Sequence, residues 1–190
     1  MRRIVCLGDS LTSGHGIGTA VAFPALLHQR VRRAGFPYEV VNAGVSRETS
    51  AHARARLDRA LEGDVRVLVI ALGANDGLRG VPVAQLTANL GHIIETAQKR
   101  GIAVLLCGME ALPIYGWAYT TAFHHAYVDL AAKHQLPLVP FILTNILGDP
   151  RMMQADRAHP NAEGACAIAD VIWPYLEDVL KQASALSPQP

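Results

Sequence analysis

The chain has 190 residues, 51% of them hydrophobic and 17% charged, with a formal net charge of +1. This composition argues against a disordered chain, the charge gives no broad basic face for nucleic acid, and the apolar runs are too short to span a bilayer. We expect one domain over residues 1–183 and a frayed tail over 184–190. Met1 leads almost directly into the first apolar run, which indicates either a cytoplasmic protein or one whose leader has been removed.

Five apolar, β-branched runs predict buried strands at 3–7, 38–42, 65–72, 103–107 and 136–141. Helical periodicity between them predicts helices that end near Gly35, Gly63 and Gly101, a fourth around 123–131, and a fifth over 165–179 that is interrupted near Pro174. This alternation predicts an α/β fold. The expected architecture is a five-stranded parallel sheet in a three-layer α/β/α sandwich.

Polar residues able to do chemistry follow these strands. Ser10 comes after the first, Gly44 after the second, Asn75 after the third, and Asp156 and His159 after the fifth. The carboxyl ends of parallel strands share one edge of the sheet, where ligands bind in open α/β folds. We therefore expect these residues to converge on one site.

The residue types suit acyl transfer. Serine becomes a nucleophile when a base activates it, and His159 suits that task because imidazole titrates near neutrality. Asp156, three residues earlier, can orient the imidazole, while the Ser10 and Gly44 amides and the Asn75 side chain can stabilise an oxyanion. Each residue also has a structural alternative: Asp156 as a helix N-cap, Gly44 as a turn glycine, and Asn75 as a turn residue.

Nearby residues are expected to play lesser parts. His15 is the rival base, but no carboxylate is arranged behind it. Asp9 and Asp76 are expected to organise their turns by local hydrogen bonds. Three cysteines lack metal-ligand spacing, so we expect no metal site and interpret them as small buried side chains (Cys6, Cys107 and Cys166).

Four motifs resemble those of the SGNH, or GDSL-type, serine hydrolases: Gly8-Asp9-Ser10-Leu11, Asn42-Ala43-Gly44, Gly73-Ala74-Asn75-Asp76 and Asp156-Arg157-Ala158-His159-Pro160. They occur in the family's order and cover nearly the whole chain. The resemblance implies a flavodoxin-like SGNH fold, a triad of Ser10, Asp156 and His159, an oxyanion hole of Ser10, Gly44 and Asn75, and no cofactor.

Further stretches are similar to the bacterial arylesterase, thioesterase I and lysophospholipase branch of that family. The segment Ile114-Tyr115-Gly116 departs from the Asn-Tyr-Gly expected there, and it is followed by Trp117. We expect Ile114, Tyr115 and Trp117 to contact substrate. The resemblance implies small-molecule substrates, namely short-to-medium acyl or aryl esters, thioesters or lysophospholipids.

Two other functions compete with this interpretation. Carbohydrate O-deacetylation uses the same constellation, although the apolar segment 112–119 favours an acyl or aryl group over a sugar. A non-catalytic flavodoxin-like nucleotide-binding module is the other alternative, suggested by the glycines between Gly14 and Gly18. That segment lacks the G-x-G-x-x-G spacing, and the chain has no Walker lysine.

Overall fold

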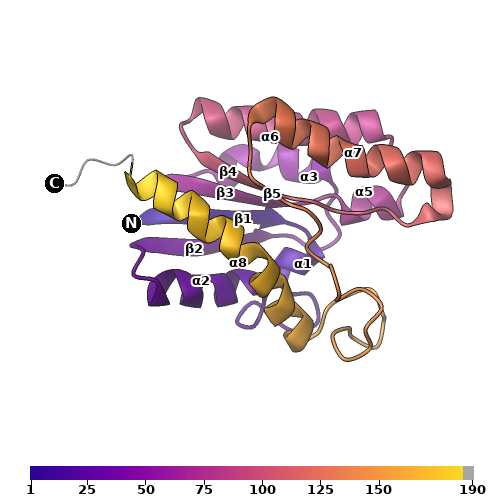
Figure 1. Ribbon diagram of the computed structural model, residues 1–190, viewed down its shortest axis with the longest axis horizontal. Coiled ribbons are helices and arrows are strands. Elements are labelled where there is room, and N and C mark those ends of the chain that lie inside the picture. The colour runs from indigo at the N-terminus through magenta and orange to yellow at the C-terminus, as the bar shows by residue number, and fades with distance from the viewer. Residues whose placement is uncertain (186–190) are drawn as a thin grey trace.

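The protein is described by a computed structural model covering residues 1–185, and it has a five-stranded parallel sheet (Figure 1). The strands are β1 (Arg2–Gly8), β2 (Tyr38–Gly44), β3 (Val65–Ala71), β4 (Ala103–Cys107) and β5 (Leu138–Val139). Their order across the sheet is β2-β1-β3-β4-β5, and every neighbouring pair is parallel. The expected fold class is confirmed.

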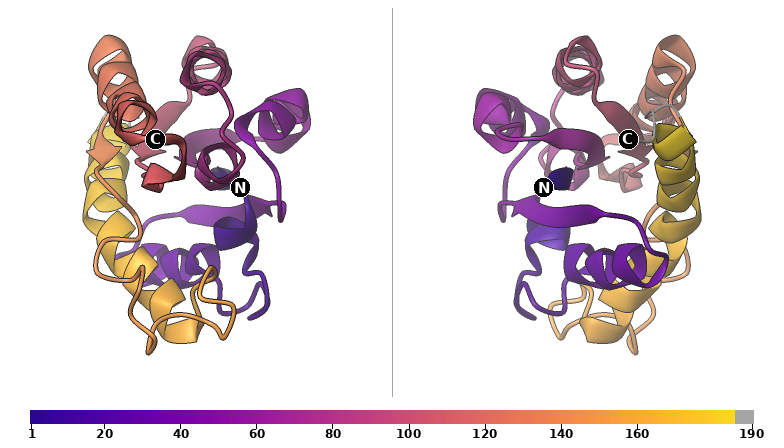
Figure 2. Two further views of the ribbon diagram at one scale, coloured as in Figure 1. Left: turned by 90° about the vertical axis from the view of Figure 1, so that its right-hand side faces the viewer. Right: turned by 90° about the vertical axis from the view of Figure 1, so that its left-hand side faces the viewer.

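Helices cover both faces of the sheet (Figures 1 and 2). One layer holds α2 (Phe23–Arg33) and α8 (Ala162–Ala185), and the other holds α3 (Ser50–Ala55), α6 (Val83–Lys99) and α7 (Trp117–His134). Shorter helices connect them: α1 (Ser10–Ser13), α4 (Leu57–Ala60), α5 (Ala74–Leu78) and the 3-10 helix η1 (Pro113–Tyr115). Within the described residues, no helix combines the length and apolar character that a membrane crossing requires.

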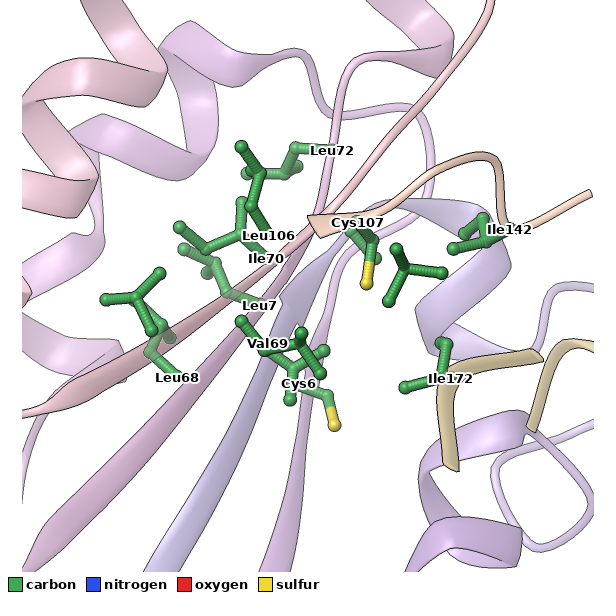
Figure 3. Close-up of a cluster of buried hydrophobic side chains, with 14 of the residues drawn as sticks. Cys6, Leu7, Leu68, Val69, Ile70, Leu72, Leu106, Cys107, Ile142 and Ile172 are labelled. Carbon is green, nitrogen blue, oxygen red and sulfur yellow. The ribbon is translucent and has the colours of Figure 1, made fainter. Parts of the chain in front are cut away.

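Alternate side chains of the strands fill two apolar layers (Figure 3). Cys6 and Cys107 lie on the α8 face together with Ile172, whereas Leu7 and Ile70 lie on the opposite face. All five are fully buried. Burial raises the pKa of the Cys6 thiol to about 12, so this cysteine behaves as a small apolar side chain.

The remaining cysteine differs from that expectation, since Cys166 is exposed on α8. Three element predictions also need correction. The expected second helix is divided at Arg56 into α3 and α4, β5 is only two residues long, and α7 starts at Trp117 rather than near Phe123. Pro137 and Pro140 flank β5, and proline has no N–H to donate to a neighbouring strand.

The C-terminal helix is longer than its sequence pattern predicts. α8 continues through Pro174 without a break and reaches Ala185. The expected tail over 184–190 is therefore helical in its first two positions. Residues 186–190 lie outside the described part of the chain.

Candidate active site

The carboxyl ends of the strands meet at one edge of the sheet, which faces the viewer in the left panel of Figure 2. Ser10 is the first residue of α1 and is separated from the end of β1 only by Asp9. Asp9 caps this short helix because its Oδ1 accepts a hydrogen bond from the Leu11 amide at 3.0 Å. The predicted local role of Asp9 is thus confirmed, and the cap fixes where Ser10 starts the turn.

His159 lies against Ser10 and is held by Asp156. Its Nε2 is 3.1 Å from Ser10 Oγ, and its Nδ1 is 2.7 Å from Asp156 Oδ2. With Nδ1–H donating to the carboxylate, Nε2 is free to accept the Ser10 proton. The three side chains that the sequence singled out therefore form one hydrogen-bonded chain.

Asp156 is also fixed by its own loop. Its Oδ1 accepts hydrogen bonds from the amides of Ala158 and His159, each at 3.0 Å. These bonds, with the larger contribution of the His159 ring, hold the pKa of the Asp156 carboxyl well below its ordinary value. Asp156 is not a helix cap, because α8 begins only at Ala162.

The rival histidine lies beside this chain of bonds. The His15 ring centroid is 4.5 Å from that of His159, and the planes are tilted by 46°. Its backbone carbonyl accepts a hydrogen bond from Gln154 Nε2 at 2.7 Å. His15 thus packs against the base position, while His159 contacts Ser10.

Asn75 approaches the site from α5. Its Nδ2 donates one hydrogen bond to the Glu48 carbonyl at 2.9 Å, and an amide nitrogen carries two hydrogens. Asn75 lines the same cavity as Ser10 and His159. Ser10 contributes a further donor, because the first amide of a helix has no intrahelical acceptor.

Gly44 is the last residue of β2. Its amide donates to Asn42 Oδ1 at 2.9 Å, and it does not line the Ser10 cavity. A Cβ at this position would collide with the Ser13 amide nitrogen. Gly44 does not have a positive φ, so the turn-glycine alternative does not apply; it permits close contact between the end of β2 and α1.

Asp76 also departs from its predicted role. It does not organise its own turn but accepts hydrogen bonds from the amide and the hydroxyl of Ser50, at 2.8 and 2.6 Å. Asn89 Nδ2 donates to the same hydroxyl at 3.1 Å. This buried network joins α3, α5 and α6 next to Asn75. Ser50 and Asn89 have no local pattern that links them to the site, so sequence reasoning missed both.

A cavity of about 360 Å³ opens beside Ser10 and His159. Its apolar part comes from the loops after β3, β4 and β5: Leu78, Met109, Leu112, Phe141, Leu143 and Leu147. Among the described residues, the lining also includes three charged side chains, those of Arg47, Glu110 and Arg157. The loop after β5 has no periodic pattern, so its apolar contribution was not anticipated.

The three expected substrate contacts do not reach this cavity. Ile114, Tyr115 and Trp117 are 61%, 49% and 74% exposed, and none of them lines it. Tyr115 instead donates its hydroxyl to the Leu78 carbonyl at 3.1 Å. The segment differs from the expected loop because η1 and the first turn of α7 turn these side chains elsewhere, and only Leu112 remains at the cavity.

Known proteins resemble this chain over most of its length. A model of the GDSL-like lipase/acylhydrolase family matches residues 6–166. The esterase TesA of Pseudomonas aeruginosa is 40% identical over 178 residues, covering 93% of this chain and 89% of that protein. The crystal structure of TesA superposes with a TM-score of 0.88 at 39% identity, covering 94% of this chain and 99% of that one.

Two further relatives carry names of the same kind. The arylesterase of Vibrio mimicus is 34% identical over 171 residues, covering 90% of this chain and 86% of that protein. The thioesterase 1/protease 1/lysophospholipase L1 of Escherichia coli K12 is 33% identical over 182 residues, covering 95% and 86%. An ester hydrolase is thereby confirmed over a non-catalytic nucleotide-binding module. The chain belongs to the GDSL-like lipase/acylhydrolase family and is an SGNH-type serine esterase.

Proposed function

We propose that the protein hydrolyses short-to-medium acyl or aryl esters through an acyl-enzyme on Ser10. The observation that carries this assignment is the chain of hydrogen bonds from Asp156 through His159 to Ser10, with Nδ1–Oδ2 and Nε2–Oγ distances of 2.7 and 3.1 Å. Nucleophile, base and orienting group lie in the relation that acyl transfer requires.

The proposed reaction has two halves. His159 Nε2 takes the Ser10 proton as Oγ attacks the ester carbonyl carbon, and then gives that proton to the departing alkoxide. A water molecule next loses its proton to Nε2 and attacks the acyl carbon, and the proton returns to Ser10 as the acid leaves. Asp156 stabilises the imidazolium that forms in each half.

The negative charge on the carbonyl oxygen needs donors that are already in place. We assign two, the Ser10 amide and the second hydrogen of Asn75 Nδ2. The first hydrogen of that nitrogen goes to the Glu48 carbonyl, which holds the side chain in position. Gly44 is left out of this assignment because its amide is bonded to Asn42.

The apolar lining supports a hydrocarbon substrate. Leu112, Phe141, Leu143 and Leu147 line the cavity that reaches Ser10. Such a lining favours an acyl or aryl group over a sugar. Thioester and lysophospholipid substrates, suggested by the name of the Escherichia coli relative, share the same acyl group.

The nucleophile is tested by substitution and by covalent labelling. Ser10→Ala is expected to lower kcat by about 10⁴- to 10⁶-fold, with His159→Ala nearly as severe, because members of a catalytic unit are not additive. A fluorophosphonate should label Ser10, as identified by peptide mass spectrometry. His15→Ala is the control for the neighbouring imidazole. If His15→Ala were the severe variant, or if Ser13 or Ser46 were labelled instead, the assignment would be wrong.

The acyl site is tested with 4-nitrophenyl esters of increasing chain length. Each methylene that gains apolar contact is expected to add up to about 0.8 kcal/mol of transition-state binding until the cavity is full. Leu143→Ala and Leu147→Ala should shift the optimum length in kcat/KM. Ile114→Asn and Trp117→Ala, which alter side chains away from the cavity, are the matched controls. If the optimum length moved only in those two variants, the acyl site would lie at the segment 112–119 instead. If acetylated sugars were cleaved faster than these esters, the protein would be a carbohydrate deacetylase.

A further inference from the structure

Two arginines with left-handed backbone lie at the Ser10 cavity. Arg47 has a φ of 71° and Arg157 a φ of 55°; both line the cavity and both are exposed. Side chains other than glycine rarely adopt this conformation, because Cβ crowds the neighbouring carbonyl oxygen. Glycine would avoid the strain at either position.

Both guanidinium groups lack a partner. Neither forms a hydrogen bond or an ion pair with any other residue in the described range 1–185. A third arginine lies alongside, since Arg79 Nη2 donates to the Arg47 carbonyl at 2.8 Å, which leaves its charge without a carboxylate. We call Arg47, Arg79 and Arg157 the arginine rim. Of the other eleven arginines, six pair with carboxylates (Arg3, Arg30, Arg56, Arg66, Arg100 and Arg151), and five have no carboxylate partner among the described residues (Arg2, Arg32, Arg33, Arg54 and Arg59).

The carboxylates near the rim already have partners. Asp156 is bonded to His159, and Glu48 forms an ion pair with Arg56 at 2.7 Å. Glu110 lines the cavity itself, but its Oε1 is 2.6 Å from His124 Nδ1. Among the described residues none of these carboxylates contacts Arg47, Arg79 or Arg157, so the guanidinium groups at the mouth of this largely apolar cavity have no ion-pair partner.

We propose that the arginine rim binds an anionic group, a carboxylate or a phosphate, carried by the ester substrate. The preferred substrate then has a hydrocarbon part that fills the apolar cavity and an anionic part that reaches the rim. A guanidinium suits this role because its fork of N–H donors matches both anions in a bidentate way. This inference rests on the proposed hydrolysis at Ser10 and names the class of ester that it acts on.

Matched substrate pairs test the proposal. One pair carries the charge on the leaving group: 4-carboxyphenyl butyrate against 4-carbamoylphenyl butyrate. The other carries it on the acyl chain: mono(4-nitrophenyl) adipate against 4-nitrophenyl 5-carbamoylpentanoate. In each pair the acid and the amide differ in charge but hardly in size. The change in the ratio of their kcat/KM values between wild type and the arginine variants therefore reports recognition of the anion, and the pair with the larger change tells on which side of the ester it binds.

Variants then link the ratio to the rim. Arg47→Met and Arg157→Met keep a non-glycine residue in the strained backbone and remove only the charge. Each is expected to lower the acid-to-amide ratio by on the order of 3- to 10-fold, and Arg47→Lys or Arg157→Lys should restore part of it. Raising the salt concentration should lower the wild-type ratio, since exposed charges are screened. Arg66→Met removes one charge from β3, at the start of the strand, and is expected to leave the ratio unchanged.

The outcomes separate the two proposals. A wild-type ratio at or below one in both pairs, or a ratio that neither arginine variant lowers, would overturn the role of the rim. The amide esters must still be cleaved in a Ser10-dependent manner in that case. Loss of Ser10 dependence for all four substrates would instead refute the proposed catalytic mechanism.

Discussion

The two carboxylates near Ser10, those of Asp9 and Asp156, illustrate how the environment of a side chain sets its pKa. Asp156 accepts three hydrogen bonds, the strongest influence being the His159 ring, and its pKa lies well below the ordinary value. Burial raises the pKa of Asp9 to about 7, and the nearby Asp76 carboxylate adds to this, while the Leu11 amide and His159 oppose it. Asp9 Oδ2 is buried without a hydrogen-bond partner among the described residues. The ionised form of an aspartate is therefore favoured at position 156 and disfavoured at position 9.

The raised pKa of Asp9 predicts a pH-dependent stability. Between about pH 4 and pH 7 the Asp9 carboxyl is ionised in the unfolded chain but still protonated in the folded protein. The free energy of unfolding therefore falls as the pH rises through this range, and it levels off above about pH 7. Asp9→Asn keeps an acceptor for the Leu11 amide but carries no charge. We expect its free energy of unfolding at pH 8 to exceed that of the wild type by on the order of 1 to 3 kcal/mol, with a smaller difference at pH 5.

Urea unfolding at the two pH values measures this difference. Asp129→Asn, which changes an exposed aspartate on α7, is the matched control and should show no such pH dependence. An Asp9→Asn variant less stable than the wild type at pH 8 would mean that the ionised carboxylate is favourable where it lies.

At the scale of elements, an aromatic ladder holds the segment that carries Asn75. Tyr115, Tyr119, Phe123 and Tyr127 follow one another at four-residue spacing, and successive ring centroids are 5.5, 5.9 and 5.7 Å apart. The three hydroxyls donate to backbone carbonyls of the segment around α5, those of Leu78, Val81 and Leu72 respectively. The η1–α7 segment thus holds the segment that carries Asn75.

Tyr127→Phe tests this support. The Tyr127 hydroxyl is buried and donates to the Leu72 carbonyl at 2.8 Å, so its removal should cost about 1 to 2 kcal/mol of stability. Tyr115→Phe removes an exposed bond of the same kind and should cost less than about 0.5 kcal/mol. Thermal or urea denaturation of the pair provides the comparison. Equal losses would show that burial does not set the value of these bonds.

The sequence predicted those elements whose signal is local. The runs that became β1, β3 and β4 are largely apolar because helices cover both faces of these strands, and α6 has a full apolar stripe ending before Gly101. The sequence did not predict the elements that tertiary contacts determine. The helices α1 and α5 are only four and five residues long. Where α3 and α4 divide, the Arg56 side chain donates to the carbonyls of Gly8 and Ala43. Short helices and such junctions have no periodicity of their own.

The same distinction holds in the site. The sequence predicted that Ser10, Asn75, Asp156 and His159 lie at one edge of the sheet. This prediction needed only the residue types and the rule that parallel strands end at a common edge. The direction of the Gly44 amide depends on which acceptor lies nearest, and that acceptor is Asn42. Which apolar side chains face the cavity depends on turns in the segment 112–119 and in the loop after β5. No spacing in the sequence encodes those choices.

Considered as a whole, the molecule combines a well-packed sheet with strained backbone at the mouth of its cavity. Arg157→Gly relieves a left-handed conformation, and the gain is partly offset by the greater freedom of glycine in the unfolded chain. We expect the variant to be as stable as the wild type or more stable by up to about 1 kcal/mol. Arg66→Gly, in the extended backbone of β3, should instead lose about 1 kcal/mol. Urea midpoints measured side by side test this, and a clear loss in Arg157→Gly would mean that its backbone carries no strain.

The hydrogen bond between Ser10 and His159 joins positions 149 residues apart. Ribosomes add about 5 to 20 residues per second, so roughly 7 to 30 seconds of synthesis separate the two side chains. During that interval the nascent polypeptide holds its serine without a base. The proposed activity at Ser10 can therefore begin only after the loop that carries Asp156 and His159 has left the exit tunnel and folded against β1.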